Sequence, residues 1–353
     1  MIKREAVMDL PPDLSALQPR IGSFQGCSPS GFHEVFYTDW GDPEAKRVIV
    51  CCHGLTRNGR DFDFLAARLA SGIDFALAET PEAVTAQPEA KSWLGARLAG
   101  LFRRRAAEAV AAPDPAKLAL APQPMPVRVV CPDVAGRGRS EWLRDPMNYG
   151  YPQYMSDMTA LIARLGVAQV DWIGTSMGGL IGMFLAAAPN SPIRSLVVND
   201  VGPVLPRAAL VRIAEYVGRD ERFANLAEVE AHLRRVHAPF GPLTDDQWRH
   251  LAQHGHRFHA DGSYGLAYDP GIAVNVQLAV KDWDFWASWD SITCPALVLR
   301  GQQSDLLSAE VADAMSKRGP KAALASFDGI GHAPALMSTD QIEIVAQWLA
   351  RQA

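Results

Sequence analysis

The sequence predicts an α/β fold with a mostly parallel central sheet flanked by helices. Short apolar runs alternate with longer stretches of helical pattern along most of the chain. Each short run is continuously apolar, as expected for strands that are buried on both faces. At 353 residues with 48% hydrophobic residues, the chain has enough apolar material to form a core. This composition excludes a wholly disordered chain.

The predicted elements can be placed in chain order. The strands are expected at 32–38, 47–52, 127–131, 170–173, 196–198, 296–299 and 322–327, with the first lying beside the second. The helices between and after them are expected at 62–70, 151–165, 178–188 and 339–350. In a sheet of this type, ligands bind beyond the carboxyl ends of the strands. We therefore looked for functional residues just after each apolar run.

Two segments interrupt the alternation and suggest a domain organisation. Residues 20–201 and 291–353 form the predicted core, with an Ala- and Pro-rich insertion at about 73–126. Residues 202–290 contain no buried-strand run and are interpreted as a helical cap over the sheet. In the insertion, 91–110 combines apolar residues with three consecutive arginines. This pattern allows contact with a membrane surface, but a helix packed on its own domain is favoured.

Charge and cysteine content exclude several classes of protein. The net charge of −5 gives no general attraction to nucleic acid, which requires dense Lys and Arg. The five cysteines are scattered and lack CxxC spacing, so neither a disulfide framework nor a zinc ribbon is expected. No export signal or run of about 18 apolar residues is found. The expectation is a soluble, cytoplasmic protein.

The motif with the clearest chemical meaning is Gly-Thr-Ser-Met-Gly at 174–178. It follows a predicted strand directly and precedes a predicted helix. A nucleophile on a sharp strand-to-helix turn needs neighbours without bulky side chains, and glycines lie two positions on either side of Ser176. The alternative is a Gly/Ser turn without function. The strand before the motif and the helix after it favour Ser176 as a nucleophile.

A serine nucleophile requires a base and an acid that orients the base. His332 lies in a Gly-rich loop after the predicted strand 322–327, and Asp305 lies just past the strand 296–299. A single loop aspartate is by default a turn residue or a helix cap. The order Ser176, Asp305, His332 nevertheless fits a catalytic triad. Asp200, which follows the strand 196–198, is the less favoured alternative for the acid.

Together these motifs resemble the α/β-hydrolase superfamily. Cys-His-Gly-Leu at 52–55 is similar to its oxyanion loop, and 131–140 is similar to its D-x-x-G-x-G-x-S turn. A serine in the nucleophile position indicates the subgroup of carboxylesterases and meta-cleavage-product hydrolases. The resemblance implies that Ser176 attacks a carbonyl, His332 acts as the base and Asp305 orients it. It also implies that the backbone N–H groups of Leu55 and Met177 form the oxyanion hole.

Four other polar residues have simpler interpretations. Asp133 is expected to stabilise its own turn, and His53 to have a structural role in the oxyanion loop. His250 and His254 have the i, i+4 spacing of a helical zinc site. However, no Glu follows His250 as in H-E-x-x-H, and glycine at position 255 breaks the helix, so a polar cap surface is preferred. No metal and no cofactor are expected.

The function predicted from these observations is hydrolysis of a carboxylic ester with a small or medium acyl group. The substrate would be a small molecule, and the reaction would pass through an acyl-enzyme. Hydrolysis of a thioester or of the carbon–carbon bond of a dienoate uses the same residue types and stays open, as does perhydrolysis. A non-enzymatic ligand receptor on the same fold is disfavoured by the complete triad. The oligomeric state is not predicted.

Overall fold

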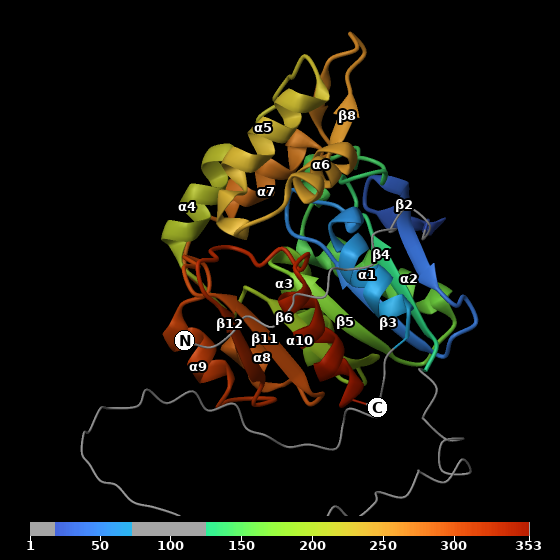
Figure 1. Ribbon diagram of the computed structural model, residues 1–353, viewed down its shortest axis with the longest axis vertical. Helices are drawn as coiled ribbons and strands as arrows, with labels where there is room; N and C mark the ends of the chain where they lie inside the picture. Colours follow the sequence, from blue (N-terminus) through green and yellow to red (C-terminus); the bar gives the residue numbers. More distant parts are fainter. Residues whose placement is uncertain (1–17, 73–124, 353) are drawn as a thin grey trace, which may run out of the picture.

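The computed structural model describes residues 18–72 and 125–352 (Figure 1). Almost all of the predicted insertion at 73–126, including the basic stretch 91–110, lies outside the described residues. The interpretation of that stretch therefore stays a prediction. Among the residues that are described, no helix has the length and apolarity needed to cross a membrane.

An eight-stranded sheet forms the centre of the molecule, in the order β1-β2-β4-β3-β5-β6-β11-β12. Its first two strands pair antiparallel, and β2 joins β4 antiparallel. The other strands run parallel. The strands are β1 (Arg20–Ser28), β2 (Gly31–Gly41), β3 (Arg47–Cys52), β4 (Val127–Pro132), β5 (Val170–Thr175), β6 (Ile193–Asn199), β11 (Ala296–Gly301) and β12 (Ala323–Phe327). The predicted mostly parallel sheet is confirmed.

One edge of the sheet differs from the arrangement that the sequence predicts. The strand predicted at 32–38 lies beside β4, and not beside β3 as expected. Strand β1 was not predicted at all. Its burial alternates and its sequence, RIGSFQGCS, has few apolar residues, because it is an edge strand with one face exposed to solvent.

Helices cover both faces of the sheet. On β3, Val48, Val50 and Cys52 pack into the core cluster on one face, and Ile49 and Cys51 into the cluster on the other. The helices α2, α3, α8 and α9 contribute to the first cluster, and α1 and α10 to the second. Their bounds are α1 (Asp63–Ala70), α2 (Tyr151–Leu165), α3 (Met177–Ala187), α8 (Trp286–Asp290), α9 (Ala309–Met315) and α10 (Thr339–Ala350). Burial on both faces explains the continuous apolar runs of the strands.

The segment 202–290 lies between β6 and β11 in the chain. Its helices α4 to α7 gather on one side of the molecule, away from α8 and α9 (Figure 1). They are α4 (Arg207–Tyr216), α5 (Leu226–Val236), α6 (Asp245–His254) and α7 (Ala273–Leu278). Two antiparallel pairs, which were not predicted, join β7 (Val204–Leu205) to β10 (Trp283–Asp284) and β8 (His256–Phe258) to β9 (Tyr264–Leu266). Strands of two or three residues are too short to produce a periodic signal.

Candidate active site

Ser176 occupies the sharp turn between β5 and α3. Its backbone has φ 51° and ψ −112°, a conformation that a non-glycine residue adopts only when its surroundings enforce it. A Cβ atom at Gly174 would lie 2.2 Å from the carbonyl oxygen of Gly178, and one at Gly178 would lie 2.0 Å from that of Cys52. The two glycines are therefore required for the close approach of strand, turn and helix.

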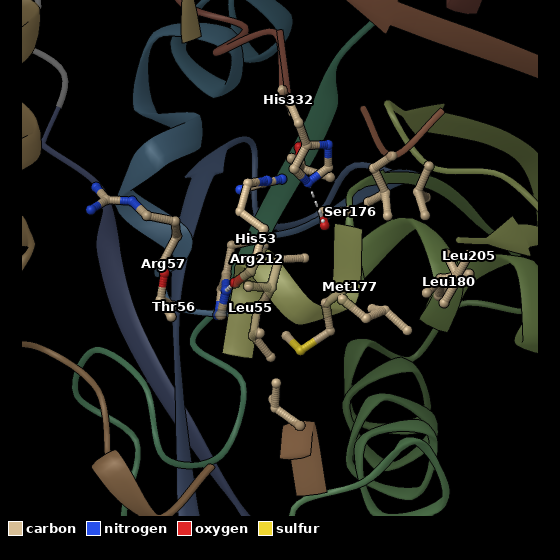
Figure 2. A pocket seen from close by; sticks show the side chains of 18 of the residues that line it. His53, Leu55, Thr56, Arg57, Ser176, Met177, Leu180, Leu205, Arg212 and His332 are labelled. Carbon is tan, nitrogen blue, oxygen red and sulfur yellow. Dashed lines mark hydrogen bonds between the residues drawn. The ribbon is translucent and has the colours of Figure 1, made fainter. Parts of the chain in front are cut away.

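His332 lies beside Ser176, as the sequence predicts. Its Nε2 atom is 2.9 Å from Ser176 Oγ (Figure 2). The loop that carries His332 follows β12, and the backbone N–H of Gly331 donates to the carbonyl of Pro239 in the segment 202–290. The imidazole is thus placed at the carboxyl end of the sheet, within reach of the serine hydroxyl.

The carboxylate that contacts His332 belongs to Asp200, and not to Asp305 as predicted. Asp200 Oδ2 lies 2.8 Å from His332 Nδ1, and Asp200 Oδ1 accepts a hydrogen bond of 2.8 Å from the backbone N–H of Gly301. Asp200 is completely buried. Because Nδ1 faces a carboxylate, it carries the proton and leaves Nε2 free to accept one from Ser176.

Asp305 lies elsewhere in the site. Its side chain is 48% exposed and forms a two-pronged ion pair with Arg212 of α4, at 2.5 and 2.9 Å. The physical reason is position after the strand. Asp200 directly follows β6 and its φ of 57° belongs to a tight turn at the strand end, whereas Asp305 lies four residues beyond the end of β11. The local sequence carries no signal that selects Asp200, because both aspartates follow strands that end at the same edge of the sheet.

The residues assigned to the oxyanion hole lie next to the serine. Met177 begins α3, so its backbone N–H has no acceptor within the helix. Leu55 follows Gly54, where a Cβ atom would lie 3.8 Å from Ser176 Cβ. Leu55 and Met177 both line the same cavity as Ser176 (Figure 2). Whether their N–H groups stabilise an oxyanion stays a prediction.

Arg137 was missed by the sequence analysis. It is completely buried, and its Nε donates to the carbonyl of Leu55 at 2.9 Å. Its Nη1 donates to the carbonyl of Ala135 and to the hydroxyl of Tyr154. Arg137 thereby holds the peptide group that joins Leu55 to Thr56. Nothing in its local sequence distinguishes it from a surface arginine.

His53 and Asp133 have the structural roles that the sequence predicts. His53 Nδ1 lies 2.7 Å from the carbonyl of Gly54, and its Nε2 accepts from the backbone N–H of Val134. Burial lowers the pKa of His53 to about 4, so the ring is neutral near pH 7. Asp133 accepts from the backbone N–H groups of Gly59 and Arg139, while burial raises its pKa to about 6.

A cavity of about 840 Å³ contains Ser176 and His332 in its wall. Most of its wall is apolar or aromatic, including Tyr151, Phe184 and Phe285. Apart from histidines, four charged side chains of the described residues line the cavity: Arg57, Asp61, Arg212 and Asp305. Side chains of both the core and the segment 202–290 form the wall. The cavity can therefore hold a largely apolar small molecule against the serine.

His250 and His254, which have the spacing of a helical zinc site, lie against α1 and the turn before it. His250 and His254 group with Asp63 of α1, and one ligand-type atom from each lies within 4.8 Å of the others. His250 Nε2 is 2.9 Å from the carbonyl of Arg60, whose Nε donates to Asp63 at 2.7 Å. Since the Arg60 guanidinium already compensates the charge of Asp63, we assign no metal to this group.

Comparison with known proteins finds similarity to hydrolases. A family profile described as "alpha/beta hydrolase fold" matches residues 116–337. A 3-hydroxybutyrate-oligomer hydrolase of Cupriavidus necator is 41% identical over 343 residues, which cover 94% of this chain and 97% of that protein.

Solved structures agree on the fold. An alpha/beta hydrolase from Novosphingobium aromaticivorans has a TM-score of 0.71 at 30% identity, covering 95% of this chain and 100% of that one. An E-2-(acetamidomethylene)succinate hydrolase has a TM-score of 0.64 at 18% identity, covering 94% and 98%.

Proposed function

The chain belongs to the α/β-hydrolase family, and from this premise we propose that it is a serine esterase with Ser176, His332 and Asp200 as its catalytic triad. The observation that carries the proposal is the continuous line of contacts from Ser176 Oγ to His332 Nε2 and from His332 Nδ1 to Asp200. Contacts of this kind let the imidazole accept the serine proton while the carboxylate fixes its tautomer.

The proposed reaction has two halves. In the first, Ser176 Oγ attacks the ester carbonyl, its proton passes to His332 Nε2, and the same proton leaves with the alcohol portion. In the second, His332 takes a proton from water, the resulting hydroxide attacks the acyl-enzyme, and Ser176 recovers its proton as the acid is released. Asp200 stays ionised and stabilises the imidazolium formed in each half.

The developing negative charge on the carbonyl oxygen needs donors that are already in position. We assign this role to the backbone N–H groups of Leu55 and Met177, each worth on the order of 3 kcal/mol in the transition state. Arg137 supports the assignment, because its hydrogen bond to the carbonyl of Leu55 fixes the peptide group that directly follows the Leu55 N–H in the chain.

For the substrate, we propose short oligoesters of 3-hydroxybutyrate or a closely similar hydroxyalkanoate. The named activity of the Cupriavidus necator relative supports this class. The apolar wall of the cavity suits methyl-branched aliphatic units. The segment 202–290 is assigned the role of a cap, since its residues Leu210, Ile213 and Trp283 line the cavity opposite the core. This cap would exclude bulk water from the acyl-enzyme except for the attacking molecule.

The experiment is a substrate panel with the purified protein. It comprises the dimer and trimer of 3-hydroxybutyrate, p-nitrophenyl esters of rising chain length, an acyl thioester and a ring-cleavage dienoate. The proposal expects turnover of the oligomers and short esters, lost in Ser176→Ala. Turnover of only the thioester or only the dienoate would reject ester hydrolysis, and turnover of short esters without the oligomers would reject the proposed substrate class.

A further inference from the structure

Arg212 is an unusual residue on the cavity face of α4. The other residues of this helix that line the cavity are Leu210, Ile213 and Tyr216. Arg212 therefore brings a guanidinium into a wall that is otherwise apolar or aromatic on this helix. Figure 2 shows it among the lining residues together with Ser176 and His332. A charged group in such a wall is a candidate for orienting a ligand.

The partners of Arg212 occupy only part of its hydrogen-bonding capacity. Arg212 Nε and Nη2 donate to the two oxygens of Asp305, and neither of these bonds uses Nη1. The side chains are 43% and 48% exposed, so this ion pair contributes little to the stability of the fold. Tyr216 of the same helix is a further hydrogen-bond partner of the Arg212 side chain. A guanidinium has five N–H donors, so Asp305 and Tyr216 together still leave donors for a second anion.

The second arginine of the cavity is in a different situation. Arg57 also forms a two-pronged pair, with Asp61 four residues further along the chain, but its side chain is only 7% exposed. A ligand in the cavity has much less access to this guanidinium. Of the two arginines, Arg212 is the one that a substrate can reach.

We propose that Arg212 is a specificity-determining residue that binds the free carboxylate of the substrate. This inference rests on the proposed function, because the carboxylate is that of a hydroxyalkanoate oligoester. In such an oligomer the free carboxylate always belongs to the alcohol portion of the ester that is cleaved. Arg212 would thus hold the leaving portion, while the acyl portion is transferred to Ser176.

Asp305 has a defined part in this arrangement. In the free protein it orients the Arg212 guanidinium in the fork geometry that also suits a substrate carboxylate. In the complex it competes with the substrate for the same cation. The two residues come from α4 and from the loop after β11, so the pair also joins the segment 202–290 to the core beside the cavity.

The test compares two substrates that differ only in charge, the 3-hydroxybutyrate dimer and the carboxamide of the same dimer. The readout is the ratio of kcat/KM for the acid to that for the amide. Arg212→Gln should lower this ratio about 10-fold, the value of one charged hydrogen bond. Asp305→Asn should raise it, because the competing anion is removed. Arg207→Gln, an exposed arginine on the same helix, is the matched control and should leave the ratio unchanged.

Each alternative outcome has its own meaning. If Arg212→Gln lowers kcat/KM for both dimers equally, Arg212 only holds the segment 202–290 against the core, and the inference is wrong. An unchanged ratio also overturns it. If the wild-type protein hydrolyses neither dimer, the proposed substrate class fails first. Calorimetric titration with 3-hydroxybutyrate then tests Arg212 by itself, since equal affinity of the wild type and Arg212→Gln overturns its role in binding a carboxylate.

Discussion

Asp200 and His332 are 132 residues apart in the chain, yet Asp200 Oδ2 lies 2.8 Å from His332 Nδ1. The backbone N–H of Gly301, at the end of β11, holds the other oxygen of the same carboxylate. Two strands therefore position this acid, since β6 delivers it and β11 fixes its orientation. This relationship separates Asp200 from Asp305, which follows β11 itself and turns toward Arg212 instead.

Ser176→Ala should remove covalent reactivity and nearly all turnover. Loss of the nucleophile in a triad costs about 10⁵- to 10⁶-fold in kcat, because the remaining residues act only together with it. We expect a fluorescent fluorophosphonate to label the wild-type protein within minutes and the variant not at all. Labelling of the variant at another residue would show that Ser176 is not the reactive nucleophile. An unlabelled wild type with an intact fold would favour a ligand receptor over an enzyme.

Gly178→Ala should be more damaging than its one added methyl group suggests. The new Cβ atom would lie 2.0 Å from the carbonyl oxygen of Cys52, a backbone atom that cannot move without shifting β3. We expect a loss of about 3 kcal/mol in the free energy of unfolding, with reduced kcat. Gly150→Ala is the control, because the new Cβ atom would lie 3.7 Å from the ring of Pro152, an ordinary contact distance, and only a helix cap is altered. Equal stability of the two variants in urea would contradict the close packing of the turn.

His53 should make the protein less stable as the pH falls. Burial lowers the pKa of its imidazole from 6.5 to about 4 in the folded state. The unfolded chain thus binds more protons between these values, so the stabilising contribution is complete above pH 6.5 and is lost as the pH falls toward 4. The expected loss between pH 7 and pH 5 is on the order of 2 kcal/mol.

The measurement for His53 is urea unfolding of the wild type and His53→Gln at both pH values. The variant cannot titrate in this range, so its stability should fall less than that of the wild type over the same interval. Because other groups titrate equally in both proteins, the difference between the two slopes isolates His53. Parallel slopes would show that the ring is accessible and already protonated at pH 5.

Much of the fold could be predicted from local sequence patterns, because the burial of each helix or strand determines which of its own residues are apolar. The helix at 151–165 and the strand at 47–52 match the structure to the residue. Burial on one helix face leaves a helical period in the sequence, and burial on both strand faces leaves a continuous apolar run. The edge strand β1 was not recognised because two of its three buried positions hold Gly26 and Ser28 instead of apolar side chains, so the expected alternation is missing. The position of 32–38 beside β4 depends on long-range pairing, which no local pattern encodes.

In the site as well, residues with a local sequence signature could be predicted, and residues that depend on tertiary contacts could not. Ser176 and His332 could be identified because a glycine-flanked turn and a Gly-rich loop have their own sequence signatures. The choice between Asp200 and Asp305 could not be made securely, since both follow strands that end at the same edge of the sheet. Arg212 and Arg137 act through tertiary contacts with Asp305 and Leu55, and such contacts leave no trace in the neighbouring sequence.

The identity of the acid is tested most directly by the kcat of two conservative variants, measured on a neutral p-nitrophenyl ester so that binding of a substrate carboxylate plays no part. Asp200→Asn should lower kcat on the order of 10⁴-fold, because an amide favours the wrong tautomer of His332. Asp305→Asn should change it by less than about 10-fold, since it alters only an exposed ion pair. A larger loss in Asp305→Asn than in Asp200→Asn would contradict the triad proposed for this protein.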